Sequence, residues 1–254
     1  MKNFVLTVLC IALAILICIA CAVYGFGYRY INLPELELKY FGTVDKDLQP
    51  LKGTIYYSDG SKGSLDAKES TITYSNGDVY YGDISGLTRS GTGKYTFKAT
   101  GDVYFGTFEN DKMSDYGTYT FSNGDIYKGG FQNGKRHGEG VYKYCDGAEY
   151  SGEYANGLRN GRGIFTWADG TVYNGDFVND LKEGYGIITY SNGDVYTGNF
   201  VKDKREGSGT YEWKAQGARY EGTFTNNEIT GHGRIIFASG RIFEGDFENG
   251  KPLA

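Results

Sequence analysis

The sequence predicts an all-β protein: an elongated single antiparallel sheet of stacked β-hairpin repeats, preceded by one N-terminal transmembrane or signal-anchor helix. Three observations carry this prediction. The first is an apolar run at the N-terminus, and the second is a glycine pattern that returns every 23 or 24 residues. The third is the composition, with 24 Tyr, 40 Gly and only 3 Pro in 254 residues. Tyr and Phe favour strands, whereas Gly favours turns and close backbone contacts.

Residues 1–30 are predicted to be the membrane anchor. No charged residue occurs between Lys2 and Arg29, and the stretch from Phe4 to Val23 is almost wholly apolar. As a helix this stretch would be about 30 Å long, which matches the hydrocarbon thickness of a bilayer. The preferred interpretation is an uncleaved single-pass signal-anchor whose short N-terminal tail leaves the repeat domain on the extracytoplasmic side of the membrane.

Two other interpretations of the N-terminus stay open. Ala20-Cys21-Ala22 fits the small-x-small pattern of a cleaved signal peptide. Ile19-Ala20-Cys21 fits the end of a lipoprotein signal, although Cys18 stands where such signals usually carry Leu.

The repeat has two strands. In the first strand an aromatic residue precedes a glycine by two positions, and a second large apolar residue follows it by two, so the pattern has the period of a β-strand. The second strand reads Gly-x-Gly-x-aromatic-x-aromatic, as from Gly161 to Trp167. The missing side chain of the glycine leaves room for a ring to lie on the backbone. The first-strand glycines are Gly82, Gly106, Gly129, Gly152, Gly175, Gly198, Gly222 and Gly245.

The connections between strands are predicted to be of two kinds. Asn-Gly and Asp-Gly pairs such as Asn123-Gly124 and Asp146-Gly147 suit tight hairpin turns. The acid that follows such a turn, for example Asp125, is interpreted as a turn residue. The other connection, for example residues 132–137, is predicted to be longer and polar.

These patterns divide the chain into four segments. Residues 1–30 are the anchor and residues 31–50 a linker. Residues 51–76 form a degenerate capping repeat, since Gly53, Ile55 and Gly60 match only part of the pattern and the terminal units of a solenoid are often atypical. Residues 77–254 hold the full repeats of about 23 residues.

The repeat resembles the MORN (membrane occupation and recognition nexus) family. Its pattern of Tyr-x-Gly-x-Phe, a glycine three residues later and a later Gly-x-Gly is matched from Tyr127 to Gly140. Asp180 and Asp203 stand where other copies have the mid-loop glycine. The resemblance implies an antiparallel stack of hairpins, a role in tethering or scaffolding, and contact with protein or lipid. It implies no enzyme.

Two surfaces are predicted to make contacts. The first is an aromatic interaction face for a protein partner, since rings are favoured interface anchors; the alternative is that these rings only pack on each other and on the glycines. Its members are Tyr104, Tyr127, Tyr150, Tyr173, Tyr196, Tyr220, Phe131, Phe177, Phe200, Trp167 and Trp213. The second is a basic edge formed by the longer connections. It comprises Lys135, Arg136, Arg159, Arg162, Lys182, Lys202, Lys204 and Arg205.

Several functional classes lack support in the sequence. The formal net charge of -5 argues against nucleic-acid binding, which requires a basic surface. The two histidines, His137 and His232, lie in distant repeats, and no metal-binding, nucleotide-binding or catalytic motif occurs within the repeats. We therefore expect no enzyme activity, cofactor or metal.

The preferred function is that of a membrane-anchored, non-catalytic scaffold that presents an aromatic β surface to a protein partner. One alternative is a cell-wall or carbohydrate-binding surface protein. A second alternative is phospholipid binding through the basic edge.

Overall fold

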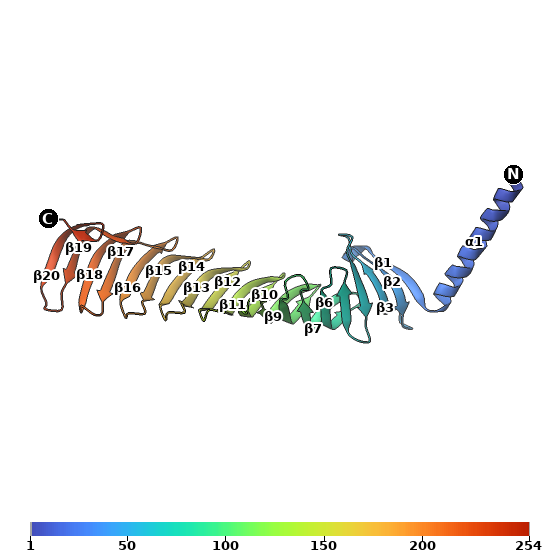
Figure 1. The fold of residues 1–254 in the computed structure, drawn as a ribbon, viewed down its shortest axis with the longest axis horizontal. Coiled ribbons are helices and arrows are strands. Elements are labelled where there is room, and N and C mark those ends of the chain that lie inside the picture. The colour runs from blue at the N-terminus through green and yellow to red at the C-terminus, as the bar shows by residue number, and fades with distance from the viewer. Residues whose placement is uncertain (1, 254) are drawn as a thin grey trace. The chain divides into compact units, whose positions relative to one another are not determined.

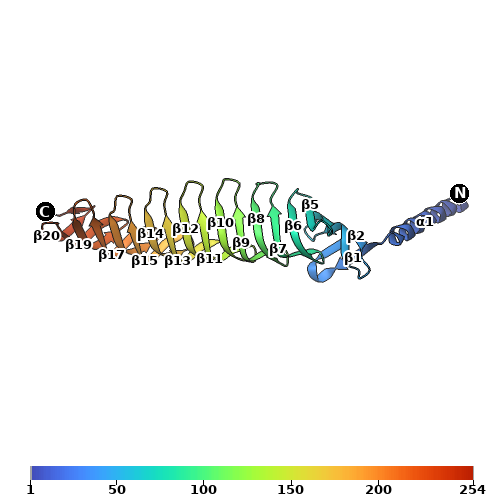
Figure 2. The same ribbon diagram turned by 90° about the horizontal axis from the view of Figure 1, so that it is seen from below.

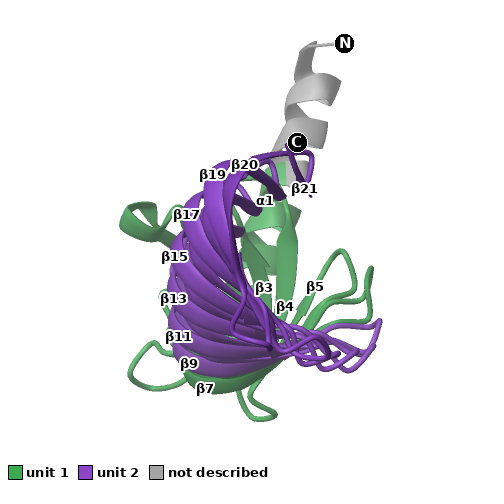
Figure 3. Cartoon of the chain, turned by 90° about the vertical axis from the view of Figure 1, so that its left-hand side faces the viewer, with its two compact units in different colours: residues 1–112 green, residues 113–254 purple. Residues whose placement is uncertain are grey.

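The structure is a computed structural model that describes the backbone of residues 2–253 and the side chains of residues 13–253. It consists of two compact units, residues 1–112 and 113–254, which are coloured separately in Figure 3. In both units each strand pairs antiparallel with a strand next to it in sequence. The hairpins can be followed by their labels in Figures 1 and 2. The predicted all-β class built from antiparallel hairpins is confirmed within each unit.

Unit 1 begins with a helix and continues with eight strands. Its elements are α1 (Lys2–Gly25), β1 (Tyr28–Leu33), the 3₁₀ turn η1 (Pro34–Leu36), β2 (Leu38–Val44), β3 (Pro50–Tyr56), β4 (Lys62–Asp66), β5 (Thr71–Tyr74), β6 (Val79–Ser85), β7 (Thr88–Thr96) and β8 (Val103–Glu109).

The predicted N-terminal helix is present as α1. Among the side chains that the structure describes, no helix combines the length and apolar character needed to cross a membrane. The side chains of residues 1–12, the first half of the predicted anchor, lie outside the described ones. From residue 13 to the helix end nearly every side chain is exposed, including Leu13, Leu16 and Ile17.

The predicted linker at residues 31–50 is wrong, because most of it is folded into the sheet. β1 pairs with β2, and β2 pairs with β3. The reason is a further copy of the repeat pattern, Tyr40-Phe-Gly42. Tyr40 is fully buried and its hydroxyl donates to the Thr43 carbonyl at 2.8 Å. Gly42 lies opposite Gly53.

Unit 2 contains the regular repeats, and its strands curve in one direction (Figure 3). Its elements are β9 (Lys112–Thr120, starting at the boundary), β10 (Ile126–Gln132), β11 (Lys135–Lys143), β12 (Glu149–Ala155), β13 (Leu158–Thr166), β14 (Val172–Val178), β15 (Leu181–Thr189), β16 (Val195–Val201), β17 (Lys204–Trp213), β18 (Ala218–Thr225), β19 (Glu228–Ile236), β20 (Ile242–Glu248) and β21 (Lys251–Pro252).

The glycines of unit 2 form a row across the strands. Gly140 pairs with Gly129 on one side and with Gly152 on the other, and Gly152 pairs in turn with Gly163. A Cβ added to Gly163 would lie 2.5 Å from Cε2 of Tyr150. The prediction that these glycines seat a ring on the backbone is therefore confirmed.

We expect Gly163→Ala to destabilise the chain by about 1–3 kcal/mol, the usual cost of overpacking a core. The ring of Tyr150 cannot move aside, because its centroid lies 5.2 Å from those of both Tyr154 and Phe177. Urea unfolding of the purified chain measures the change. Ser151→Ala, an exposed position one residue from Tyr150, is the control and should leave the midpoint unchanged. Equal urea unfolding midpoints for Gly163→Ala and Ser151→Ala would contradict the packing of the Tyr150 ring on Gly163.

The two kinds of connection are the reverse of those predicted. The connection expected to be longer is a two-residue turn: Gln132 pairs with Lys135 around Asn133-Gly134, and both turn residues have positive φ. The Asn-Gly and Asp-Gly connections are longer, as where Tyr144 N donates to the Ala148 carbonyl at 2.9 Å. Asn and Asp tolerate left-handed backbone better than most residues, so the glycine at the second turn position is replaceable.

Candidate functional site

The first aromatic row of unit 2 is a buried core. Tyr127, Tyr150, Tyr173, Tyr196 and Tyr220 are fully buried. Each ring makes edge contacts with the large ring four residues later and with its counterpart in the next repeat, at centroid distances of 4.9–5.4 Å.

The hydroxyls of these tyrosines are also used internally. Each donates to a carbonyl three residues later, as from Tyr150 to Glu153 at 3.0 Å and from Tyr173 to Asp176 at 2.9 Å. Burial raises the pKa of Tyr127 to about 12. These groups are therefore structural hydrogen-bond donors at neutral pH.

Most of the predicted interaction face must therefore be corrected, because its rings are enclosed by their neighbours and by the glycine row. The buried members are Tyr104, Tyr127, Tyr150, Tyr173, Tyr196, Tyr220, Phe131, Phe177 and Phe200. Only Trp167 and Trp213 are half-buried and reach the surface.

A second aromatic row is the accessible one. It contains one half-buried ring per repeat, at the last aromatic position of the second strand, and it shares the face of the buried tyrosines because Tyr142 pairs with Tyr127. The sequence reasoning singled out only its two tryptophans, although the 23-residue spacing marks the other members equally. We call this set the half-buried row: Phe121, Tyr144, Trp167, Tyr190, Trp213 and Phe237.

Neighbouring rings of the half-buried row are linked through a second set of rings, each two positions earlier in the sequence. Phe121 lies 5.5 Å from Tyr142, Tyr142 lies 4.5 Å from Tyr144, and Tyr144 lies 5.7 Å from Phe165, measured between ring centroids. Phe165 in turn lies 4.6 Å from Trp167. The result is a continuous aromatic strip across neighbouring repeats.

Four residues of the predicted basic edge lie over these rings. The Arg136 guanidinium lies 5.3 Å from the Tyr142 ring and 5.0 Å from the Tyr154 ring. Arg159 and Arg205 repeat this arrangement, and Lys182 lies 5.5 Å from Trp167. Such cation–π contacts contribute about 0.5–2 kcal/mol each.

The same four cations bind the loop of the following repeat. Arg159 pairs with Asp180 at 3.1 Å, and Lys182 pairs with Asp203 at 3.1 Å. Arg136 donates to the Gly157 carbonyl at 2.7 Å, and Arg205 donates to the Asn227 carbonyl. The predicted free basic edge is wrong for Arg136, Arg159, Lys182 and Arg205, which are inter-repeat clamps.

The remaining members of the predicted basic edge are exposed. Lys135, Lys202 and Lys204 lie at the two-residue turns, and Lys204 donates to Asn226 at 2.7 Å. Arg162 extends from β13, and its side chain is 89% exposed. Because Asp180 and Asp203 share these turns, this edge carries both signs of charge.

The longer turns are held together by their acids. Asp125 is almost fully buried and accepts hydrogen bonds from the Tyr142 hydroxyl at 2.7 Å and from the Cys145 amide at 2.8 Å. Burial alone would raise the pKa of Asp125, but these hydrogen bonds outweigh burial and lower it. Asp78 and Asp194 make the equivalent contacts. Their interpretation as turn residues is confirmed.

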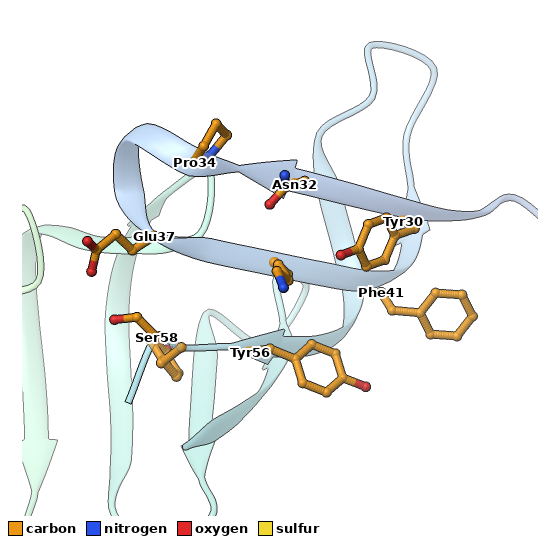
Figure 4. A pocket seen from close by; sticks show the side chains of 9 residues that line it. Tyr30, Asn32, Pro34, Glu37, Phe41, Tyr56 and Ser58 are labelled. Atoms are coloured by element: carbon orange, nitrogen blue, oxygen red, sulfur yellow. The ribbon is translucent and has the colours of Figure 1, made fainter. Parts of the chain in front are cut away.

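Open pockets with aromatic walls lie in both units. One, of about 300 Å³, lies in unit 2 beside Arg205, Trp213 and Phe224. The other, of about 720 Å³, lies in unit 1 on β1–β3 (Figure 4). It is lined by Tyr30, Asn32, Pro34, Glu37, Lys39, Phe41, Tyr56, Tyr57 and Ser58.

No group of three or more His, Cys, Asp or Glu side chains within the described part of the chain could hold a metal ion. His232 pairs instead with Asp246 at 3.2 Å and Glu244 at 3.4 Å on an exposed surface. Hydrogen bonds that the His232 ring donates to these two carboxylates raise the pKa of His232.

Stacked hairpins with a shared glycine row and a shared aromatic core define a β-hairpin repeat protein. A model of the MORN repeat matches residues 104–126, 127–149, 150–172, 173–195, 196–217 and 220–240, which together make up more than half of the chain. The chain therefore belongs to the MORN repeat family.

Comparison with curated proteins found no match. Among solved structures, the G-box domain of the microcephaly protein CPAP is similar at 15% identity, over 76% of this chain and 97% of that one, with a TM-score of 0.37. The TCP domain of SAS-4 (dCPAP) from Drosophila melanogaster, in complex with a proline-rich motif of Ana2, has 16% identity over 77% and 89% of the two chains and a TM-score of 0.36. The TCP10 domain of Danio rerio CPAP has 14% identity over 87% and 99%, with a TM-score of 0.30.

Proposed function

We propose that this protein is a non-catalytic scaffold that binds an extended segment of a protein partner along the half-buried row of unit 2. The observation that carries this proposal is the recurrence of one accessible ring per repeat. Two strands separate successive rings, so the rings recur at about 9.6 Å. A partner chain laid across the repeats would meet the same chemistry at every step.

The surroundings of the row also favour a protein segment. Rings with one accessible edge are typical interface anchors. The clamping cations beside these rings are partly exposed: the exposed fraction of the side chain is 21% for Arg159 and 16% for Lys182. A partner with aromatic or proline side chains and some acidic residues fits this surface. Glycan binding, and phospholipid binding through Lys135, Lys202 and Lys204, stay predictions from the sequence.

A photo-crosslinking amino acid placed at Trp213 tests the proposal. We expect adducts with a protein partner in cells, because Trp213 borders the unit 2 pocket. The matched control is the same group at Tyr185, which is 60% exposed on the opposite face. With the partner in hand, Trp213→Ala should weaken binding at least ~10-fold, as for an interface hot spot. Adducts at position 185 but not at 213 or 167 would contradict the proposal.

We further propose that the N-terminal segment attaches the scaffold to a membrane as a single-pass anchor, with the repeats on the extracytoplasmic side. The support is the apolar sequence from Phe4 to Val23 together with the exposure of Leu13, Leu16 and Ile17. Apolar side chains exposed on all sides of a helix need an apolar surrounding. Resistance of the full-length chain to alkaline extraction from membranes, and its loss on deletion of residues 1–25, is the expected result.

A further inference from the structure

The outer face of β1, β2 and β3 differs in chemistry from the rest of unit 1. Register places alternate residues of these strands on this face, since Tyr30 pairs with Phe41 and Lys39 pairs with Tyr56. The opposite face holds the buried Leu38 and Tyr40. We call the set the β1–β3 outer face: Tyr28, Tyr30, Asn32, Lys39, Phe41, Thr43, Lys52, Thr54 and Tyr56.

This face is aromatic and basic. Tyr30 and Phe41 are 54% and 40% exposed, and Tyr28 lies 5.7 Å from Phe41 between ring centroids. The face holds two lysines and no carboxylate. Lys52 is satisfied by Asp66 of β4 at 2.7 Å, whereas Lys39 is exposed in the wall of the 720 Å³ pocket. Figure 4 shows Tyr30, Phe41 and Tyr56 along this wall.

The face is tied directly to the end of α1. Arg29 donates to the carbonyls of Tyr24 and Tyr28 at 2.9 and 2.8 Å, and its guanidinium lies 5.3 Å from the Tyr24 ring. Val44 N donates to the Gly27 carbonyl at 3.3 Å. The Arg29 bond joins Tyr24, in the last turn of the helix, to β1, and the Val44 bond joins Gly27, just after the helix, to β2. The first hairpin is therefore held at the end of the helix.

We propose that the β1–β3 outer face rests in the headgroup region of the same bilayer that holds α1. This inference rests on the membrane attachment proposed above. Tyrosine favours that region because its ring is apolar and its hydroxyl is polar. Lys39 is the lysine of this face that is not held by Asp66, and an exposed lysine complements lipid phosphates. Tyr24 and Phe26, which precede the face in sequence, are 51% and 79% exposed.

Geometry restricts how the hairpin lies. The headgroup region is about 5–8 Å thick on each side, whereas Tyr30 lies five residues beyond Gly25, up to about 17 Å along an extended chain. Tyr30 and Phe41 therefore reach headgroups only if β1 runs along the membrane surface. The first hairpin then lies on the membrane surface and fixes the orientation of the first strands of unit 1 there; we call this hairpin the foot.

Single tryptophans in the full-length chain test this placement. In a Trp167→Phe, Trp213→Phe background, tryptophan is introduced singly as Ile17→Trp, Tyr30→Trp, Phe41→Trp and Tyr185→Trp. Each protein is reconstituted in phosphatidylcholine–phosphatidylglycerol vesicles, with and without acyl chains brominated near the headgroup. The four positions that receive a tryptophan are at least 40% exposed, and thermal melts that match that of the Trp167→Phe, Trp213→Phe background confirm folding.

We expect quenching at positions 30 and 41 to exceed that at 185 at least threefold, with the signal at 17 also quenched. Lys39→Glu should reduce quenching at 41 without changing it at 17. Quenching at position 17 alone would contradict the placement of the first hairpin in the headgroup region but would still support the membrane anchor. Absence of quenching at all four positions would overturn both.

Discussion

Replacing Tyr150 by alanine is expected to destabilise the chain by about 3–5 kcal/mol, the range for removing a buried aromatic side chain. Tyr150 is fully buried, contacts Tyr154 and Phe177, and donates to the Glu153 carbonyl at 3.0 Å. The effect is large because each solenoid repeat is stabilised through its neighbours. The Tyr150 ring contacts one ring of its own repeat and one of the following repeat.

Urea unfolding followed by circular dichroism measures this effect. Tyr150→Phe separates the hydroxyl from the ring and should cost only about 1 kcal/mol, the value of one hydrogen bond. Tyr185→Ala is the control, because that ring is 60% exposed, and its cost should stay within about 0.5 kcal/mol. Similar losses for Tyr150→Ala and Tyr185→Ala would show that the first aromatic row is not the core.

Replacing Asp125 by alanine is expected to cost about 3 kcal/mol at neutral pH, since hydrogen bonds to a charged group contribute about 1.5–3 kcal/mol each. The change leaves the Tyr142 hydroxyl and the Cys145 amide without their acceptor. The Cys145 amide belongs to the next longer turn and Tyr142 to the strand before it, β11, so one substitution loosens the turn of Asp125 and the turn that follows in the stack.

The same residue should make stability depend on pH. The folded-state pKa of Asp125 is lowered, so its stabilisation is present above the unfolded value of about 3.9 and is lost as the pH falls through the folded value. The stability difference between parent and Asp125→Ala should therefore shrink as the pH is lowered from 6 towards 3. Ser151→Ala, at an exposed position that carries no titratable group, should keep a constant difference. A stability difference between the parent and Asp125→Ala that does not change with pH would contradict the role of the Asp125 carboxylate as a charged hydrogen-bond acceptor.

The repeat itself could be predicted because period and burial agree at every copy. Tyr-x-Gly-x-Phe places both rings and the glycine on one face, and the structure buries that face. The burial of Tyr150 could not be predicted from one strand, since it depends on Phe177 of the next repeat. A lone ring looks the same in sequence whether it is core or surface.

The errors have equally specific causes. Tyr40-Phe-Gly42 is hard to recognise because Val44 replaces the ring two residues after the glycine, and Leu51 replaces the first glycine of the Gly-x-Gly pattern. The pairing of Gly42 with Gly53 nevertheless follows that of Gly129 with Gly140. The turn lengths were interchanged because Asn-Gly occurs in both connections, and only the register of Gln132 with Lys135 separates them. The clamping role of Arg159 was hidden because its partner, Asp180, lies 21 residues away.

The clamps give the stack a direction. Arg136, Arg159, Lys182 and Arg205 each bond the two-residue turn of the following repeat. The series ends where Ile229 stands at the cation position, and there the Gly250 amide donates to the Ile229 carbonyl at 3.0 Å. The clamp accommodates one extra residue between the strands, because Arg205 reaches Asn227 across 22 residues and Arg159 reaches Asp180 across 21. Evolution is therefore freer to change the length of the longer turns than that of the two-residue turns, which hold the cation and its acceptor in register.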